Sequence, residues 1–415
     1  MWQTLKKILV IAAEFPPMGG PGVQRTAKFV KYLSRQGYHP VVITKEYQGG
    51  LKDYSLLQDL GEYSRYDLPG HDWVNGKGLL GRIKNIIATR LFIPDADTFW
   101  YRKHRQRILD IINKENIEWV YTTSYPYSDH LIGLYAKTRC SNIKWIVDFR
   151  DEWTNNPYHK SQWHKKARWF IEKKMERAVL GNCDYLITNT PFMLENFIDD
   201  VPELENKSTY IPNGYDEEDF QLYQLKNQNN SKFKIIYVGS LYGRRIPDYF
   251  FEAIKELHSE LVVTPETMEI EFIGHYNQKR MNRYIEDFNL HGMMTVKEYM
   301  PHDQLLESVG YANALLLIER EKNFYTGKIF EYLKMGVPIL ATVPIDGAAA
   351  SVIYETGTGA VVDAEDVPGI KNAVRKLYEG WKENQIIYHP KEEAIRTYSR
   401  ESQTKQLIQC FEKIR

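Results

Sequence analysis

The 415-residue sequence is poor in cysteine and has no surplus of either charge. Its three cysteines, Cys140, Cys183 and Cys410, are far apart and show neither a C-x-x-C pair nor a metal-like spacing. We therefore expect reduced thiols in a cytosolic protein. The 54 Lys and Arg balance the 54 Asp and Glu. Nucleic-acid binding usually requires a basic surplus, so this balance argues against it. The balance does not exclude a local basic patch.

Long hydrophobic runs are also missing. No stretch approaches the ~20 apolar residues that a membrane span needs. The apolar run after Lys7 is too short for a signal peptide and ends at Glu14, so it predicts a buried first strand in a cytoplasmic protein. With 43% hydrophobic residues, the chain is long enough for two domains of roughly 200 residues each.

Short, almost wholly apolar segments alternate with longer helical patterns. Runs that are apolar on both faces are typical of parallel sheets covered by helices on each side. Because the same rhythm occurs twice, we predict an α/β protein with two Rossmann-like, doubly wound parallel-sheet domains. The predicted strands are Lys7–Ala13, Pro40–Thr44, Glu118–Thr122, Lys144–Phe149, Tyr185–Asn189 and Ser208–Ile211 in the first half, and Lys234–Gly239, Glu269–Gly274, Met294–Lys297, Asn313–Ile318, Pro338–Thr342 and Gly359–Val362 in the second.

A polar segment separates the two halves. Gly214–Lys232 is poor in apolar residues and is typical of a linker. The last segment, Lys391–Arg415, has a helical pattern that no strand follows. We predict an N-terminal domain over residues 1–212, a C-terminal domain over 213–390, and a C-terminal helix over 391–415 that packs back on the first domain.

A glycine-rich turn with Gly19, Gly20 and Gly22 follows the first strand. Glycines let the backbone approach a ligand closely, and the N-terminus of the following helix presents free N–H groups to an anion. The order is not G-x-G-x-x-G, and Lys45 follows the second strand where a dinucleotide enzyme has an acidic residue. Both features argue against a dinucleotide oxidoreductase. A plain loop is the alternative interpretation.

A charged cluster ends the fourth strand of the first half, in the sequence Asp148-Phe-Arg150-Asp151-Glu152-Trp153. Charged residues at the carboxyl ends of parallel strands lie where open α/β sheets bind ligands. Charges beside a buried strand need partners or a substrate. The cluster is therefore either functional or an internal salt bridge that supports a loop. His130, which follows the preceding strand, joins the candidate group.

Two basic segments of the second half suit a diphosphate. Arg244 and Arg245 follow a strand–glycine turn, and arginine binds phosphate bidentately. A solvated helix start is the alternative. Lys328 and Glu331, which come directly after Gly327, share one helical face. They form either a surface ion pair or a site in which Lys328 meets a phosphate and Glu331 accepts hydrogen bonds from a ribose.

Together these segments resemble the retaining glycosyltransferases of family 4, which have the GT-B fold. The resemblance runs over nearly the whole chain. It implies two domains facing across a cleft, with a nucleotide-sugar donor on the C-terminal domain and an acceptor on the N-terminal one. The matching motifs are Gly19-Gly20, Ile211-Pro-Asn213-Gly214-Tyr-Asp216, Val238-Gly239-Ser240 and Gly327-Lys328-Ile-Phe-Glu331-Tyr-Leu.

The resemblance assigns residues to the donor. Glu331 matches the second glutamate of the family's E-x7-E signature and is expected on the ribose, whereas Asn323 stands in place of the first. Ser240 replaces an arginine that often binds the phosphates in the family. Arg244, Arg245 and Lys328 are therefore the candidates for binding the donor phosphates. The full donor set is Gly19, Gly20, Arg244, Arg245, Thr326, Gly327, Lys328 and Glu331.

The implied reaction is a retaining, metal-independent hexosyl transfer without a dedicated protein base, from a UDP- or GDP-sugar to a glycan or lipid-linked acceptor in bacterial surface polysaccharide synthesis. Cations beside the leaving diphosphate stabilise the transition state selectively. No cofactor is expected. The catalytic set, which would orient acceptor and sugar, is His130, Asp148, Arg150 and Asp151. Asp95-Ala-Asp97 resembles a metal-binding D-x-D, but it lies in a first-domain loop, so no metal is expected.

Three alternatives remain at this stage. An epimerase or a phosphorylase of the same fold would share the donor site, and a non-catalytic sugar-binding protein would share the two-domain plan. Residues 79–92 and 163–170 mix basic with apolar residues. They indicate either peripheral docking at the inner face of the cytoplasmic membrane or buried amphipathic helices.

Overall fold

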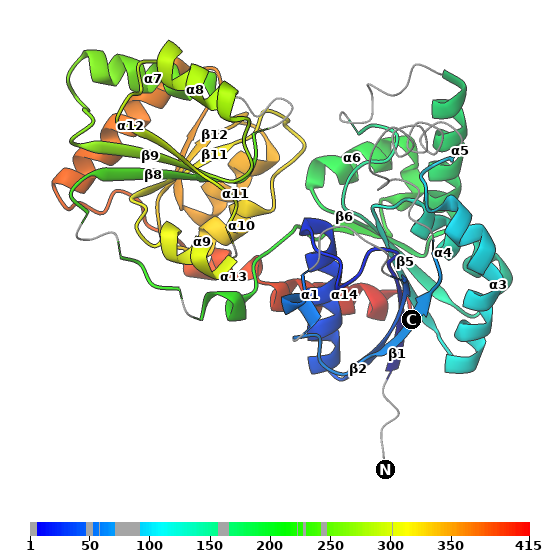
Figure 1. The fold of residues 1–415 in the computed structure, drawn as a ribbon. Coiled ribbons are helices and arrows are strands. Elements are labelled where there is room, and N and C mark those ends of the chain that lie inside the picture. Colours follow the sequence, from blue (N-terminus) through cyan, green and yellow to red (C-terminus); the bar gives the residue numbers. More distant parts are fainter. Residues whose placement is uncertain are drawn as a thin grey trace. The chain divides into compact units, whose positions relative to one another are not determined.

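The computed structural model describes residues 6–46, 53–57, 59–70, 92–156, 166–221, 223–226, 230–241, 247–300 and 302–415. The chain divides into two compact units (Figure 1). Unit 1 is Met1–Asn213 together with Arg400–Arg415, and unit 2 is Gly214–Ser399. Each unit is a parallel sheet between layers of helices, so the predicted fold class is confirmed.

Unit 1 contains a seven-stranded sheet in the order β3-β2-β1-β4-β5-β6-β7. Its strands are β1 (Lys6–Ile11), β2 (Tyr38–Lys45), β3 (Ser64–Leu68), β4 (Trp119–Ser124), β5 (Lys144–Phe149), β6 (Tyr185–Thr188) and β7 (Ser208–Tyr210). Its helices are α1 (Pro21–Arg35), α3 (Thr98–Glu115), α4 (Ser128–Arg139), α5 (Lys166–Asn182), α6 (Pro191–Asp200) and α14 (Arg400–Lys413), with short 3-10 turns η1 (Ser55–Leu57) and η3 (Pro202–Leu204).

The two faces of this sheet bury separate apolar clusters. Alternate residues of each strand point to opposite faces. Ile8 and Val10 of β1 pack with α1 and α14, whereas Leu9 and Ile11 pack with the cluster of α3, α4 and α6. The strands are therefore apolar on both faces, which is why they are visible in the sequence.

All twelve predicted strands form, with bounds that differ by at most two residues from the expected ones. The sequence pattern missed β3, whose residues Ser-Arg-Tyr-Asp-Leu contain no apolar run. This strand lies at the edge of the sheet and pairs only with β2 among the described strands. An edge strand with partly exposed faces does not need the apolar pattern that marks the others.

Unit 2 contains a six-stranded parallel sheet in the order β10-β9-β8-β11-β12-β13. Helices α7, α8 and α12 cover one face, where their apolar side chains join one cluster with the strands. Its strands are β8 (Phe233–Val238), β9 (Met268–Ile273), β10 (Met294–Lys297), β11 (Ala314–Ile318), β12 (Ile339–Thr342) and β13 (Gly359–Val362). Its helices are α7 (Asp248–Ser259), α8 (Gln278–Asp287), α9 (His302–Val309), α10 (Lys328–Lys334), α11 (Ala348–Thr356), α12 (Val367–Lys382) and α13 (Glu392–Thr397), with the 3-10 turn η4 (Glu217–Phe220).

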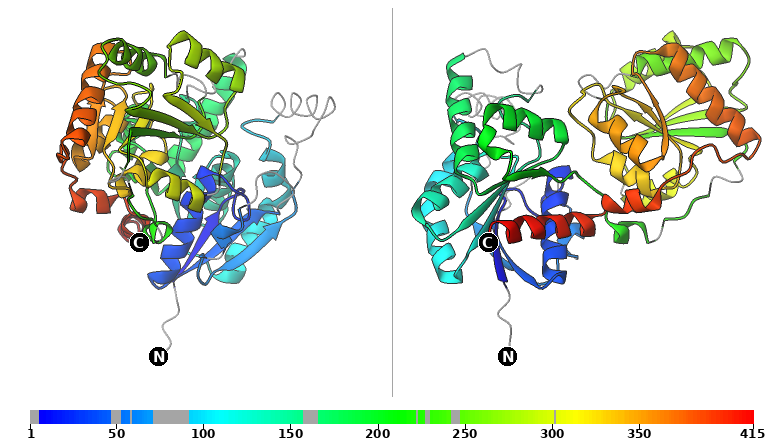
Figure 2. Two further views of the ribbon diagram at one scale, coloured as in Figure 1. Left: turned by 60° about the vertical axis from the view of Figure 1, so that its left-hand side comes forward. Right: turned by 180° about the vertical axis from the view of Figure 1, so that it is seen from behind.

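The C-terminal segment is two helices rather than one. Helix α13 belongs to unit 2, where Ser399 bridges to Tyr215. Helix α14 belongs to unit 1 and packs across α1 (Figure 2, right). The passage into unit 1 therefore comes at Arg400, nine residues after the predicted start at Lys391. Within the described residues, no helix has the length and apolar character of a membrane span.

Candidate functional site

The carboxyl edge of the unit 1 sheet brings most of the predicted catalytic residues together. The strand order reverses between β1 and β4, so the loops after these two strands diverge. In open α/β sheets, such a switch point is where ligands bind. Gly19 and Gly20 follow β1, His130 lies on α4 after β4, and Asp148 to Asp151 end β5.

Helix α1 starts with a glycine in an unusual conformation. Gly20, its N-cap residue, has φ of 130°, which residues with a side chain rarely adopt. Gly22 lies in the first helical turn, and a Cβ placed there would be 2.0 Å from Nη1 of Arg150. The absence of a side chain at this position lets the guanidinium of Arg150 pack directly against the N-terminus of α1.

Asp148 is bound by protein groups from other elements. Arg25 of α1 donates to both of its oxygens, from Nε at 2.8 Å and from Nη2 at 3.1 Å, and the Tyr121 hydroxyl donates as well. Arg25 also donates to the carbonyls of Ile211, at 2.9 Å, and Pro212, at 2.7 Å. All three side chains of the cluster are buried. These contacts favour the structural alternative for Asp148, because its charge is already neutralised inside the unit.

Arg25 is a residue that the sequence interpretation missed. It joins α1, the end of β5 and the chain after β7 through one guanidinium group. The sequence feature that could have identified it is the position of Arg25 among Val23, Ala27 and Val30, which all face the core. A charge on the buried stripe of a helix requires a partner, and Asp148 at a strand end was the available one.

His130 is fully buried and lies on the opposite face of the sheet. Its Nδ1 is 2.9 Å from Oγ1 of Thr122, which also accepts a hydrogen bond from Nε1 of Trp145 at 3.0 Å. Burial, with the nearby charge of Arg150, lowers the pKa of His130 from its usual 6.5 to about 3. The ring is therefore neutral near pH 7, and it positions neighbouring groups better than it shuttles protons.

Arg150 and the partly exposed Asp151 lie closest to solvent in this cluster. Arg150 donates through Nε to the carbonyl of Ser124 and through Nη2 to that of Tyr125, at 2.8 Å. Both carbonyls belong to the end of β4 and the turn that follows it. The arginine thus holds the loops after β4 and β5 together at the N-terminus of α1.

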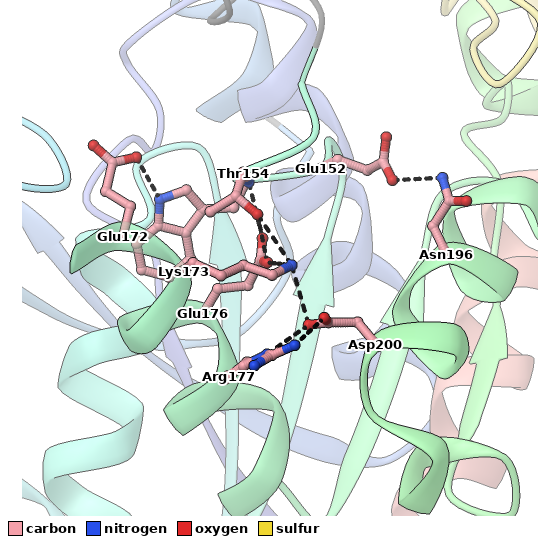
Figure 3. A network of polar contacts seen from close by, with 9 residues as sticks. Glu152, Thr154, Glu172, Lys173, Glu176, Arg177, Asn196 and Asp200 are labelled. Atoms are coloured by element: carbon pink, nitrogen blue, oxygen red, sulfur yellow. Dashed lines mark hydrogen bonds and ion pairs between the residues drawn. The ribbon is translucent and has the colours of Figure 1, made fainter. Parts of the chain in front are cut away.

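Helices α5 and α6 anchor the chain after Asp151 (Figure 3). Glu176 accepts from the backbone N–H of Thr154 at 2.9 Å and from its hydroxyl at 2.7 Å. Glu172 accepts from Nε1 of Trp153 at 3.1 Å. Asn196 of α6 donates to Glu152 at 2.7 Å. Because Glu172, Glu176 and Asn196 lie on regular helices, the loop that carries Arg150 and Asp151 has a fixed course.

In unit 2, the predicted donor residues surround the start of α10. Lys328 donates from Nζ to the carbonyl of Val238 at the end of β8, and its Nζ lies 4.0 Å from the centre of the Tyr237 ring. Thr326 is buried, and its hydroxyl has no partner among the described residues. Gly327 is exposed and Glu331 is partly exposed. The motif therefore places the cation of Lys328 beside the glycine turn after β8, with the unpartnered hydroxyl of Thr326 and the carboxylate of Glu331 on the same segment at the start of α10.

Some of the predicted residues lie outside the described structure, and the two carboxylates of the D-x-D sequence have protein partners. Arg244 and Arg245 lie outside the described residues, as do residues 79–91 and 163–165, whereas residues 166–170 form the start of α5. Asp97 pairs with Lys45 at 2.7 Å, and Asp95 accepts from the N–H of Ser128 at 3.0 Å and from its hydroxyl. Both carboxylates of the D-x-D sequence are thus engaged by protein groups.

Two family models together match almost the whole chain. Glycosyltransferase Family 4 matches residues 22–219, and Glycosyl transferases group 1 matches residues 220–400. The chain belongs to the group 1, family 4 glycosyltransferases. The boundary between the two matches lies close to the boundary between the two units of this glycosyltransferase. No curated protein matches its sequence.

Solved structures with the same fold cover nearly the full length of this glycosyltransferase. A glycosyltransferase from Rickettsia africae is 15% identical, with a TM-score of 0.65 over 99% of this chain and 98% of that one. The lipopolysaccharide outer core galactosyltransferase WaaB is 10% identical, with a TM-score of 0.61 over 98% and 99%. Anabaena HepE, in complex with UDP and glucose, is 13% identical, with a TM-score of 0.60 over 98% and 99%. These likenesses confirm the GT-B fold.

Proposed function

We propose that this glycosyltransferase moves a hexose from a nucleotide-sugar to a hydroxyl of a glycan or lipid-linked acceptor, with retention of configuration and without a metal ion. The observation that carries the proposal is the group of polar side chains at the start of α10, beside the glycine turn after β8. Support for the donor class comes from Anabaena HepE, which has been solved with UDP-glucose.

The donor-binding proposal rests on Lys328, Thr326 and Glu331. The Lys328 ammonium at the end of β8 is a point charge beside a backbone that a phosphate can approach closely, because Gly239 has φ of 110° and no side chain. The buried hydroxyl of Thr326 offers a further hydrogen bond to the ligand. Glu331, one helical turn after Lys328, would accept hydrogen bonds from the ribose hydroxyls.

The chemistry that these groups support is departure of a nucleoside diphosphate. Negative charge grows on the leaving phosphate as the glycosidic bond breaks, so a cation fixed there stabilises the transition state more than the ground state. In a retaining transfer without a protein base, the leaving phosphate would take the proton of the acceptor hydroxyl on the same face of the sugar. In unit 1, Arg150 and Asp151 would orient the acceptor.

A role in surface polysaccharide synthesis is part of the proposal. WaaB and WaaG, which share the fold, are described as acting in lipopolysaccharide synthesis. Transfer is expected to survive excess EDTA, because Asp95 and Asp97 are engaged by Ser128 and Lys45. Loss of activity on chelation, with recovery on adding manganese, would contradict the metal-free mechanism.

The donor site can be tested by calorimetric titration of UDP and GDP. Loss of a charge-assisted contact costs roughly 1.5–3 kcal/mol, so Glu331→Ala and Lys328→Met should each weaken nucleotide binding about tenfold or more. Lys382→Met is a matched control, because this lysine also lies over a tyrosine ring, at 5.6 Å from the centre of Tyr378, but on α12. Unchanged affinity in both site variants would reject the donor site.

A further inference from the structure

Unit 2 contains a cavity at the amino edge of its sheet. Its volume is about 740 Å³, which is within the range of pockets that hold small molecules. Asn313, Pro338 and Thr358, which directly precede β11, β12 and β13, line it from the sheet. The proposed donor residues lie at the carboxyl edge, and the four residues of β12 separate the two edges by roughly 13 Å. The cavity is therefore separate from the proposed donor site.

The end of α12 and the loop after it form the outer wall of the cavity. Asn384 and Gln385 donate from their backbone N–H groups to the carbonyls of Trp381, at 3.2 Å, and Gly380, at 2.8 Å. A Cβ at Gly380 would lie 3.0 Å from Cγ2 of Ile387, so the glycine lets the loop pack closely on the helix. These contacts fix the course of the loop, and the cavity is formed by ordered elements of unit 2.

The side chains that line the cavity carry no charge. Among the described residues that line it, none is Asp, Glu, Lys, Arg or His. Most are aliphatic or aromatic, such as Leu333 of α10 and Leu377 and Trp381 of α12. A charged group of a ligand would lose its hydration in this space without gaining a partner, which is unfavourable. The part of a ligand that enters the cavity is therefore uncharged.

The polar side chains nearest the sheet already have protein partners. Oδ1 of Asn313 accepts from the backbone N–H of Lys234 and from Nδ2 of Asn230, both at 2.9 Å. Oγ1 of Thr358 lies 2.9 Å from Oγ1 of Thr356. No buried polar atom that lacks a partner in the described structure belongs to a lining residue. A sugar or a nucleotide needs several hydrogen bonds and finds few here, whereas a hydrocarbon chain needs none.

Apolar side chains continue from the cavity to the surface of unit 2. Ile386 and Leu225 both line the cavity, and they are 80% and 41% exposed. They come from different parts of the chain, the loop after α12 and the segment before β8. A chain that is longer than the cavity would cover these two side chains where it leaves.

We propose that this cavity binds the hydrocarbon chain of a single-chain lipid, with the polar end of the lipid in water at the mouth beside Ile386. The chain lies between the amino ends of β11, β12 and β13 and the last turns of α12. Burial of apolar surface on both partners drives the binding. The inference goes beyond the proposed transfer reaction and does not depend on it, because no lining residue belongs to the donor or catalytic set.

Calorimetric titration with octanol, nonanol and decanol, each below its solubility limit, tests the cavity. Each additional CH₂ group that the cavity buries should tighten binding about fourfold. Ile386→Glu places a carboxylate at the mouth, from which an entering chain would remove water, so decanol binding should weaken about tenfold or more. Leu225→Glu should have the same effect. Both side chains are exposed, so both variants should fold as the wild type does.

Leu261→Glu is the matched control for these variants. Leu261 is 79% exposed and also belongs to unit 2, but it does not line the cavity. The variant should bind decanol as the wild type does. UDP added at increasing concentration should not displace decanol, because the proposed donor site lies at the other edge of the sheet.

Each outcome decides the proposal. Decanol binding that is absent in the wild type, independent of chain length, or equal in wild type, Ile386→Glu and Leu225→Glu overturns it. Displacement of decanol by UDP would place the chain in the donor site and also overturn it. A wild-type dimer that Ile386→Glu converts to a monomer, or binding to phosphatidylcholine vesicles that this variant abolishes, would assign the apolar mouth to a second copy or to a membrane instead. Absence of UDP binding would reject the donor site and leave the decanol result unaffected.

Discussion

At the scale of single residues, the buried ion pair of Arg25 and Asp148 has the largest expected effect on stability. Both side chains are fully buried, and the pair is joined to Tyr121 and to two backbone carbonyls. Removing one member of such a pair leaves the other charge uncompensated, which costs about 3–5 kcal/mol. Replacing both members leaves no charge behind and costs less.

The first prediction is that Asp148→Asn lowers the free energy of unfolding of unit 1 by about 3 kcal/mol or more. The double variant Arg25→Met with Asp148→Leu should be less destabilised than the sum of its parts. Urea unfolding of the single and double variants measures both effects. A folded Asp148→Asn protein of normal stability that has lost transfer activity would instead make Asp148 catalytic.

The second prediction concerns pH and His130. Its pKa is about 3 in the folded protein, against 6.5 when unperturbed. As the pH falls below 6.5, the unfolded chain binds a proton at this site and the folded protein does not. Stability is therefore highest above pH 6.5 and falls between pH 6.5 and about 3, by roughly 1.4 kcal/mol per unit at most.

Unfolding free energies at pH 7, 5.5 and 4.5 check this dependence. His130→Gln removes the titrating group, so its stability should decline less between these pH values than that of the wild type. The comparison uses the slope with pH, so a constant loss of stability in the variant does not affect it. Equal slopes in the two proteins would show that His130 is solvated and titrates normally.

At the scale of elements, the sequence pattern predicts the strands that are buried between helices. It does not predict elements or contacts that depend on a partner from another part of the chain. The strands under both helix layers are buried along nearly their whole length and mostly apolar, so their positions followed from composition. Edge strand β3 has no such pattern. The motif at α10 could be located because glycines and charges adjoin a strand end. The anchoring of the loop after β5 could not, because Glu172 and Glu176 look like ordinary charges of a helix until their acceptor role for Trp153 and Thr154 is known.

The third prediction concerns this anchor. Glu176 of α5 is buried and receives two hydrogen bonds from Thr154 and one from Lys173, at 2.9 Å. Glu176→Gln replaces a full acceptor with a group that can place an N–H against these donors, which costs about 1–3 kcal/mol. Since the loop carries Arg150 and Asp151, we expect a lower transfer rate with unchanged nucleotide affinity. Steady-state kinetics and calorimetry measure the two quantities.

Glu195→Gln is the matched control for that variant. Glu195 is an exposed residue of α6, on an element that also contacts the loop. It should leave rate, stability and nucleotide affinity unchanged. A Glu176→Gln protein with a normal transfer rate would show that the course of the loop does not depend on α5.

At the scale of the whole molecule, the two units share one chain but have separate cores. Helix α14, from the C-terminal end of the sequence, packs on unit 1. Its Leu407 and Phe411 are buried in the apolar cluster with α1 and the sheet. The Phe411 ring lies 5.4 Å from that of Trp119. The stability of unit 1 therefore depends on residues that follow unit 2 in the sequence, whereas unit 2 is continuous.

The fourth prediction uses this asymmetry together with the positions of the cysteines. All three cysteines of the chain, Cys140, Cys183 and Cys410, belong to unit 1. Burial raises the pKa of the Cys183 and Cys410 thiols to about 12, so both are unreactive until unit 1 opens. Cys140 is partly exposed and can react in the folded protein, so the rate at which Cys183 and Cys410 are labelled in urea reports the unfolding of unit 1 alone.

Phe411→Ala should lower the urea midpoint of thiol labelling, because truncating a buried phenylalanine costs about 3–5 kcal/mol. In the proposed donor site, a nucleotide bound by Lys328 and Glu331 would stabilise unit 2, and that stabilisation would grow with ligand concentration. A bound nucleotide should therefore raise the urea midpoint of unit 2, measured by hydrogen exchange of its backbone amides, and Phe411→Ala should not change it. If the variant and the nucleotide shift both signals equally, the two units unfold as one, and α14 stabilises the whole glycosyltransferase.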